Sequence, residues 1–388
     1  MKVAIDAVGI RSHGGASVLL EWLRWLPVVR PDWQWHVFLL KRRFRQFENP
    51  PPDQRVFVEE TSHGNGRLAR WLWVNYQLPR QLPRLRVDAL LSFANVGPAH
   101  PPVPAVLFVH QPKAVDPAYS GCHGVRDRIR LAGIRRGICQ SAKSSRFVIV
   151  QTQAMRRALA ALAPQLDGRV RVIPSGYREV ENPLRVRPEL RSQVENLARP
   201  RLVYVANVGE HKNHRFLVEV LPLLLRRFPK LQLMFTLEAP ALSSSPGGAY
   251  ERSLQQRATE LGVPSHLCWL GHLSGEEVYW VLQQSDLSVF PSLAESFGLP
   301  LVESMVAGCP IAVADRPYAH EVCGDAACYF DPEDPAAAFT CISEVLQDRA
   351  LRDKLLCQSE TRCQRFAYRG IADQVAETLE AALQHAPA

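Results

Sequence analysis

The sequence predicts an α/β protein with two doubly wound parallel-sheet domains, on three observations. Short apolar runs of strand length alternate with helical segments along most of the chain, as is typical of parallel sheets. The 388 residues exceed what one hydrophobic core usually serves. The charge is also divided, because residues 1–180 hold 27 Lys and Arg against 12 Asp and Glu, whereas residues 181–388 hold 19 against 26. The two halves are therefore expected to meet different partners.

The first domain is predicted over residues 1–180. Its expected strands, all short and apolar, are Lys2–Ala7, His36–Leu40, Ala89–Ser92, Val106–Val109, Phe147–Val150 and Val170–Ile173. Helices are expected at Val18–Leu26 and around Arg67–Leu82, with Gly14 and Gly15 in the loop before the first of them. Because ligands bind beyond the carboxyl ends of the strands in such sheets, this glycine loop and His110 are candidates for a binding site.

Residues 181–200, rich in proline and charge, are predicted as a linker, and residues 201–366 as the second domain. The expected strands of the second domain are Leu202–Val205, Leu231–Leu237, Cys268–Leu270, Leu287–Phe290 and Ile311–Val313. Its expected helices are Phe216–Phe228, Glu276–Gln284, Pro335–Leu346 and Arg349–Phe366. A last helix, Ile371–Gln384, is predicted within residues 367–388.

Residues 286–315 carry the most informative pattern, a strand, a loop, a helix and a second strand. The helix begins beside Gly298 with Pro300 in its first turn, where a missing N–H costs nothing. The free N–H groups of such a helix N-terminus favour an anion. Glu295 in the loop and Glu303 in the helix suit hydroxyl groups, because a carboxylate accepts hydrogen bonds from them well. A nucleotide sugar offers both groups, a diphosphate with a sugar ring on each side.

The same residues read F-P-S-x-x-E-S-F-G-L-P-x-x-E-x-M-x-x-G-x-P, with two glutamates separated by seven residues. This string resembles the donor-binding motif of the retaining glycosyltransferase family 4. The resemblance implies the GT-B fold, two Rossmann-like domains facing across a cleft, with the last helix crossing back to the first domain. It is dense over residues 200–335 and thin over residues 1–170. Considered without the rest of the motif, Glu303 could also be a charge that complements the helix dipole, and Glu295 could be a solvated carboxylate of the loop.

The resemblance implies a role for each residue of this motif. Glu303 would hold the ribose hydroxyls, and Glu295 the 3- or 4-hydroxyls of the donor sugar. Backbone groups of Phe297, Gly298 and Leu299 would complete that end of the donor site.

Other segments match the family outside that motif. Lys212, in a strand-to-helix turn, would stabilise the leaving diphosphate, although a lone lysine is usually a solvated charge. Asn207 stands where the family usually has arginine. The family places the nucleotide base at His272 and Leu273. Gly15 would lie near the diphosphate and His110 would contact the donor sugar, although a glycine pair can be only a turn and a histidine can end a strand without a ligand.

The predicted activity is a retaining transfer of a hexose from a nucleoside-diphosphate sugar to a saccharide or lipid-linked saccharide. The expected pathway is the assembly of bacterial cell-surface polysaccharide or lipopolysaccharide, with His110, Lys212 and Glu295 as catalytic residues. The nucleotide sugar is a co-substrate, so no cofactor is expected, and GDP-mannose is one candidate donor. Two alternatives stay open: a non-catalytic GT-B protein that binds nucleotide sugars, which Asn207 favours, and a GT-B sugar-nucleotide epimerase.

Composition and charge limit the classes of partner that the chain is expected to bind. The longest apolar runs are shorter than the ~18 residues of a membrane span, and the first residues read as a strand and not as a secretion signal. The nine cysteines include no C-x-x-C pair and no metal-ligand spacing, so we expect core thiols in a reducing cytoplasm and no metal. The basic charge is too diffuse for a nucleic-acid module. Residues 67–73 and 126–136 mix arginine with large apolar side chains, which predicts peripheral contact with an anionic membrane, on the cytoplasmic face of the inner membrane.

Overall fold

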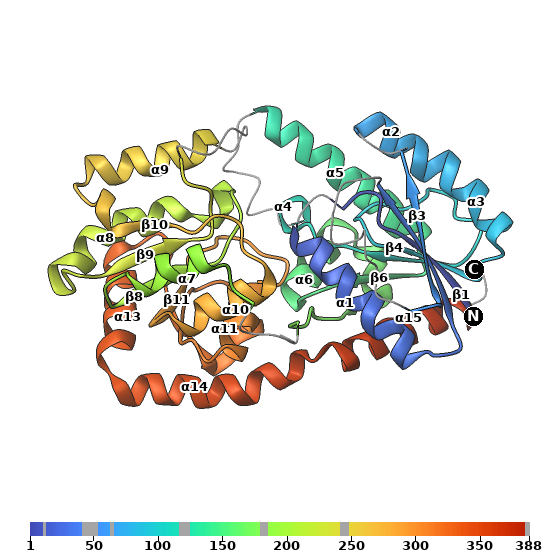
Figure 1. Cartoon of the computed structure of the whole chain (residues 1–388). Helices are drawn as coiled ribbons and strands as arrows, with labels where there is room; N and C mark the ends of the chain where they lie inside the picture. The colour runs from blue at the N-terminus through green and yellow to red at the C-terminus, as the bar shows by residue number, and fades with distance from the viewer. Residues whose placement is uncertain are drawn as a thin grey trace. The chain divides into compact units, whose positions relative to one another are not determined.

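Met1–Gly176 and Ala367–Ala388 form one unit of the chain, and Tyr177–Phe366 form a second. We call them the amino-terminal and the carboxyl-terminal unit. The structure is a computed structural model that describes residues 1–10, 13–40, 53–62, 66–115, 125–178, 185–240 and 248–384. The last helix, α15 (Tyr368–Gln384), belongs to the amino-terminal unit although it follows the whole second unit in sequence (Figure 1).

The described residues of the amino-terminal unit form a parallel sheet in the order β3-β2-β1-β4-β5-β6-β7. The strands are β1 (Lys2–Asp6), β2 (Gln34–Leu40), β3 (Val56–Thr61), β4 (Ala89–Ser92), β5 (Ala105–Phe108), β6 (Phe147–Val150) and β7 (Val170–Val172). The strand order reverses between β1 and β4. The apolar runs predict every one of these strands except β3, an edge strand in which only three apolar residues, Val56–Val58, precede two exposed glutamates.

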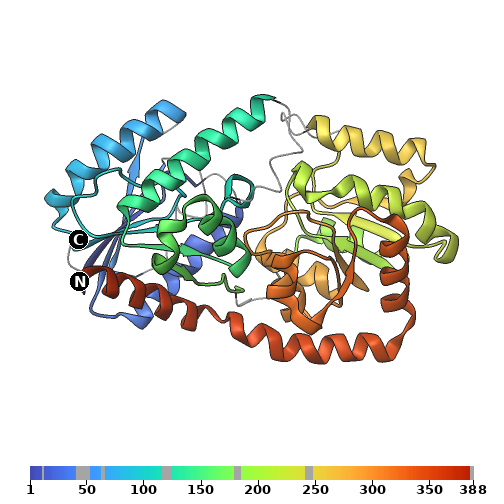
Figure 2. The ribbon, with the colours of Figure 1, turned by 180° about the vertical axis from the view of Figure 1, so that it is seen from behind.

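Helices cover both faces of this sheet. On one face α1 (His13–Val29) and α15 lie side by side, as both views show (Figures 1 and 2), and Trp22 of α1 packs on Phe93 and Phe108 at centroid distances of 5.1 and 4.9 Å. The helical segments of the other face are α2 (Arg67–Leu72), the π-helical η2 (Trp73–Gln77), α3 (Leu78–Leu85), α4 (Pro112–Val115), α5 (Val125–Ser144) and α6 (Gln153–Leu162). They share a face because Ala105 packs with α3 and Leu107 with α5, and alternate residues of a strand point to the same side.

The start of α1 differs from the prediction. The helix begins at His13, so Gly14 and Gly15 lie in its first turn and not in a loop. Glycine is a poor helix former, which is why the pair predicts a turn. The first turn tolerates it because its N–H groups have no intrahelical acceptor in any case.

The carboxyl-terminal unit has a parallel sheet in the order β10-β9-β8-β11-β12-β13 over its described residues. The strands are β8 (Arg201–Tyr204), β9 (Gln232–Phe235), β10 (Leu267–Trp269), β11 (Leu287–Phe290), β12 (Ile311–Ala314) and β13 (Cys328–Phe330). The helices are α7 (Pro188–Glu195), α8 (His214–Arg227), α9 (Gly248–Glu260), α10 (Gly275–Gln283), α11 (Leu299–Val306), α12 (Pro317–Cys323), α13 (Pro335–Gln347) and α14 (Arg349–Cys363). The strand order reverses between β8 and β11, and the predicted α/β class with two doubly wound parallel sheets is confirmed.

Helix α7 lies within the segment predicted as a linker, so an unstructured connection is wrong for residues 188–195; residues 181–184 lie outside the described ranges. Pro188 stands in the first turn, where proline favours a helix start. Leu190 and Val194 are buried in the same cluster as Val203 of β8. The sequence pattern does not predict this short amphipathic helix, because charged residues of the segment outnumber the apolar residues that mark its buried face.

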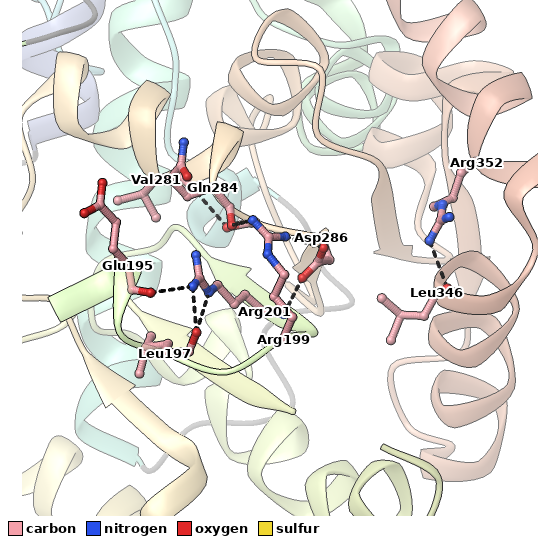
Figure 3. Close-up of polar contacts among 10 residues, drawn as sticks. Glu195, Leu197, Arg199, Arg201, Val281, Gln284, Asp286, Leu346 and Arg352 are labelled. Carbon is pink, nitrogen blue, oxygen red and sulfur yellow. Dashed lines mark hydrogen bonds and ion pairs between the residues drawn. The ribbon is translucent and has the colours of Figure 1, made fainter. Parts of the chain in front are cut away.

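Arginine side chains fasten the end of α7 to the sheet (Figure 3). The Arg201 guanidinium donates to the carbonyl oxygens of Glu195 at 2.9 Å and of Leu197 at 2.6 and 3.0 Å. Asp286 accepts from the Arg201 backbone N–H at 2.7 Å and from the Arg199 guanidinium at 2.5 Å. A basic side chain on the last carbonyls of a helix stabilises its C-terminus, so α7 is an integral part of this unit.

Candidate functional site

Two loops meet where the strand order of the carboxyl-terminal sheet reverses. One follows β8 and carries Lys212 at the end of a 3₁₀ turn, and the other follows β11 and carries Glu295. Lys212 Nζ lies 2.5 Å from Glu295 Oε1, and the two side chains are 17% and 11% exposed. Ser292 Oγ donates to the same carboxylate oxygen at 2.7 Å. The structure therefore brings together two of the predicted catalytic residues at the edge where open α/β sheets bind ligands.

Buried tyrosines hold the backbone of both loops. The Tyr204 hydroxyl donates to the Lys212 carbonyl oxygen at 2.7 Å, and the Tyr318 hydroxyl donates to the Ser292 carbonyl oxygen at 2.7 Å. Both rings are at most 3% exposed. A site fixed in this way needs little reorganisation when charge develops on a ligand.

Helix α11, which follows the Glu295 loop, carries Glu303. Gly298 precedes the helix with φ 92°, a left-handed conformation that favours glycine, and Pro300 stands in the first turn. The Glu303 carboxylate is half-buried and has no hydrogen-bond or ion-pair partner in the described part of the chain. Burial raises its pKa from 4.5 to about 7. A desolvated carboxylate without a partner is costly, and such groups concentrate at functional sites.

The other predicted donor-binding residues of this unit differ in what they can contact. Phe297 is 2% exposed and packs on Phe366 at a centroid distance of 5.4 Å, so its side chain belongs to the core and its backbone alone is available to a ligand. Leu299 is half-buried against the same core. Asn207 is exposed in the loop after β8, on the same loop as Lys212.

The segment predicted to hold the base is anchored by a buried carboxylate. The His272 carbonyl oxygen accepts from the Arg187 guanidinium at 3.0 Å, and Arg187 is held by Glu277 at 2.6 Å. This ion pair raises the pKa of Arg187. Leu273 is half-buried against the cluster that contains α10. Both predicted base-site residues thus lie on a braced segment between β10 and α10.

In the amino-terminal unit, His110 follows β5 and contacts Asn95, which follows β4. Its backbone N–H donates to Asn95 Oδ1 at 2.8 Å, and Asn95 Nδ2 lies 3.1 Å from its ring Nε2. Ring Nδ1 is buried and has no hydrogen-bond partner among the described residues, and burial lowers the His110 pKa to about 4. Gly15 is buried in the first turn of α1, which follows β1. His110 and Gly15 therefore both follow strands of the amino-terminal sheet.

Sequence reasoning missed three residues that hold this machinery in place. Ser292 stands within the F-P-S motif itself, so its position beside Glu295 was the accessible signal. Asn95 is a polar residue shortly after an apolar strand, which is a weaker signal of the same kind. Tyr204 looks like any aromatic core residue at a strand end, and nothing in the sequence marks its contact with the Lys212 backbone.

The surface predicted to meet a membrane is only partly exposed. Trp73 is fully buried and donates from Nε1 to Asp6 at 3.0 Å, and Arg70 is paired with the same carboxylate at 2.7 and 2.9 Å. The sequence predicts that these two residues face lipid, and this is wrong. Both side chains donate to Asp6 instead, because Asp6 at the end of β1 is completely buried and needs donors. The side chains of Arg67 and Arg126 lie outside the described part of the structure.

Large apolar side chains are nevertheless exposed on the helices of that face. On α2, η2 and α5 they are Leu68, Trp71, Leu72, Tyr76 and Ile129, with 71%, 52%, 40%, 46% and 67% exposure. In the described parts of the chain, no helix has the length and apolar character needed to cross a membrane. Within the same residues no group of three or more His, Cys, Asp or Glu side chains is placed to hold a metal ion.

Two units, each with a doubly wound parallel sheet, are the architecture of the GT-B fold, and solved structures with this fold align over nearly the whole chain. The Anabaena protein HepE in complex with UDP and glucose aligns with a TM-score of 0.72 at 19% identity, over 98% of this chain and 100% of that one. WaaG, a glycosyltransferase involved in lipopolysaccharide biosynthesis, aligns with a TM-score of 0.70 at 14% identity, over 97% and 99%. At these identities the similarity shows the shared fold alone.

The family match lies in the carboxyl-terminal unit. Residues 186–361 match the family model described as glycosyl transferases group 1. The chain is 32% identical over 124 residues to the putative glycosyltransferase EpsD of Bacillus subtilis, covering 32% of this chain and 30% of that protein. It is 32% identical over 98 residues to the O-antigen chain mannosyltransferase RfbU of Salmonella typhimurium, covering 25% and 28%. The chain thus spans less than a third of the length of these two relatives.

Proposed function

We propose that the protein is a retaining glycosyltransferase that moves a hexose from a nucleoside-diphosphate sugar to a saccharide or lipid-linked saccharide. The observation that carries this proposal is the Lys212–Glu295 pair at the reversal point of the carboxyl-terminal sheet, followed in the next helix by Glu303, whose carboxylate has no partner among the described residues. The family match over this unit and the relatives named as glycosyltransferases support the same reaction class. The proposed pathway is the assembly of cell-surface polysaccharide or lipopolysaccharide in bacteria.

The two partners of the ion pair separate when donor binds. The diphosphate carries two negative charges and competes with Glu295 for Lys212, at the end of a loop whose backbone is held by Tyr204. Glu295 is then free to accept hydrogen bonds from hydroxyls of the donor sugar. Charge-assisted hydrogen bonds of this kind contribute about 1.5–3 kcal/mol each. The free protein thus keeps both groups oriented by pairing them with each other.

Bond breaking places negative charge on the leaving diphosphate and positive charge on the sugar ring. Lys212 and the N–H groups at the start of α11 stabilise the diphosphate, and Glu303 holds the ribose. The acceptor hydroxyl forms the new bond to the anomeric carbon on the face that the diphosphate leaves. Its proton passes to a phosphate oxygen, so the reaction needs no separate base. In this proposal Lys212 and the helix N-terminus stabilise the diphosphate charge in place of a metal, and no cofactor takes part.

A donor panel tests the proposed function. Purified protein is incubated with UDP-, GDP- or ADP-hexoses, with and without lipid-linked saccharide acceptors, and mass spectrometry follows the extended acceptor and the released nucleotide. We expect extension with one donor class, loss of turnover in Glu295→Gln, and no effect of Glu333→Gln, whose carboxylate is 77% exposed. Epimerised donor without acceptor, or donor binding without turnover across the panel, would contradict the proposal.

We further propose that the exposed apolar face of α2, η2 and α5 rests on an anionic membrane, on the cytoplasmic face of the inner membrane, where a lipid-linked acceptor lies. Exposed aromatic and aliphatic side chains suit the headgroup boundary, and each nearby cation adds on the order of 1 kcal/mol. Co-sedimentation with anionic vesicles at low salt should fall in the double variant Trp71→Ala/Leu68→Ala. Equal recovery with neutral and anionic vesicles would contradict this surface.

A further inference from the structure

Asn95 occupies a fixed position between β4 and β5. Its backbone is left-handed, with φ 66°, a conformation in which asparagine and aspartate are enriched among residues with side chains. Its backbone N–H donates to the Phe108 carbonyl oxygen at 3.2 Å. The side chain is therefore delivered to the carboxyl end of β5, where His110 lies.

The orientation of the Asn95 amide follows from the chemistry of its two contacts. The His110 backbone N–H can only donate, so the group 2.8 Å away is the amide oxygen. The amide nitrogen therefore faces ring Nε2, at 3.1 Å. Because an amide NH₂ can only donate, Nε2 must carry a lone pair, and the proton of the neutral ring lies on Nδ1.

The Nδ1 side of the ring faces no partner among the described residues. Nδ1 is buried without a hydrogen bond in the described part of the chain, and the ring packs near Phe93 and Phe108 at centroid distances of 6.0 and 5.3 Å. Burial alone lowers the pKa of His110 to about 4, with no charged side chain contributing, so the ring is neutral at physiological pH. A buried N–H without an acceptor is rare in folded proteins and calls for a ligand or a water at that point.

We propose that Asn95 is a positioning residue that holds His110 as the neutral Nδ1–H tautomer, so that Nδ1–H donates to a hydroxyl oxygen of the sugar substrate. The inference rests on the proposed function and deepens it. A neutral single donor selects an uncharged oxygen acceptor, whereas a phosphate is better held by a cation such as Lys212. His110 thus donates a hydrogen bond to the sugar and adds no positive charge for the diphosphate.

Asn95→Asp tests the assignment with little disturbance of the fold. Aspartate keeps the left-handed preference and can still accept from the His110 backbone N–H, but it replaces the donor at Nε2 by an acceptor. Long-range ¹H–¹⁵N NMR on the full chain, with the ring signals assigned through His110→Gln, reports the tautomer directly. We expect Nδ1 to be protonated in the wild type and not to titrate between about pH 5.5 and 8. In Asn95→Asp we expect Nε2 to be protonated and the ring to titrate at higher pH.

Asn75→Asp is the matched control, because Asn75 also bridges two groups of the same unit, the Ala99 N–H at 3.2 Å and the Trp71 carbonyl at 3.0 Å, without contacting a histidine. It should leave the His110 signals unchanged. A wild-type ring protonated at Nε2, or an unchanged tautomer in Asn95→Asp, would overturn the proposal.

Kinetics separate this proposal from the proposed function. In Asn95→Asp we expect kcat to fall at least tenfold while the donor KM changes less than threefold, with a new pH dependence of kcat that follows the ring titration. A switched tautomer with unchanged kcat would overturn the role of His110 in reading the substrate. If the wild type transfers no sugar, the proposed function fails, and the NMR result still decides the tautomer assignment.

Discussion

Replacing Glu303 by glutamine removes a carboxyl group that has a pKa of about 7, raised by burial. In the proposed site the ionised carboxylate accepts ribose hydroxyls, and the protonated form loses part of that capacity. Below its pKa the free protein must therefore release a proton to bind donor. Each pH unit well below the pKa costs about 1.4 kcal/mol, so the Kd for a nucleotide sugar should approach a tenfold rise per unit and reach, at pH 5, about 100 times its value at high pH.

Calorimetry with an intact nucleotide sugar measures this effect. The diester phosphates of the donor do not titrate in this window, so the protein supplies the pH dependence. Titrations in two buffers of different ionisation enthalpy should show release of about one proton at pH 5.5 and none at pH 8.5. Glu303→Gln should bind about 10–100-fold more weakly at pH 8, with a flat profile below pH 7, because it lacks the charge-assisted hydrogen bonds. Glu333→Gln should behave as the wild type.

The same group affects stability with a defined sign. The pKa of Glu303 is higher in the folded protein than in the unfolded chain, so ionisation opposes folding. Its cost is absent below about pH 4.5, grows through about pH 7 and is constant above, reaching roughly 3 kcal/mol. Glu303→Gln should therefore raise the urea midpoint at pH 8 and leave it unchanged near pH 4.5. A wild type and a variant with the same pH dependence of both donor binding and unfolding would refute this reasoning.

Three further predictions follow from the remaining contacts. Glu295→Gln should lower turnover by about 100-fold or more. The nucleoside-diphosphate affinity measured by calorimetry should stay the same or tighten, because Lys212 loses its competing partner, and a loss of nucleotide binding would contradict this. Asn207→Arg should tighten nucleoside-diphosphate binding by roughly 1–3 kcal/mol, and unchanged affinity would mean that this exposed position does not face the diphosphate. Arg70→Met should lower the free energy of unfolding by about 3–5 kcal/mol in urea titrations, because it leaves Asp6 buried without its cation. The control Arg80→Met, at an exposed position, should change it by less than about 0.5 kcal/mol, and equal effects of the two variants would argue against the buried pair.

Local signals were sufficient for the strand, loop, helix and strand of residues 286–315. The apolar run predicts β11 at Leu287–Phe290, and Pro300 and Gly308 bound the helix that the structure shows as α11. Each signal acts through near neighbours: a proline in a first turn, a glycine after a last turn, and apolar side chains of one period. The same reasoning fails for β3, where the apolar run is only three residues long, and for α7, where charged and polar residues predominate.

The sequence by itself therefore determined the fold class, most strands, and which residue types could hold a diphosphate and two sugar rings. The tertiary structure decided the partners. Lys212 and Glu295 are 83 residues apart in the chain, and Asp6 and Arg70 are 64 apart, yet both pairs are in hydrogen-bond contact. From the sequence, Arg70 and Trp73 are expected to face lipid, but in the structure both side chains donate hydrogen bonds to the buried Asp6. Element type follows from short-range preferences, whereas partner choice follows from strand order and from the cost of burying a charge alone, and these exist only once the sheet is assembled.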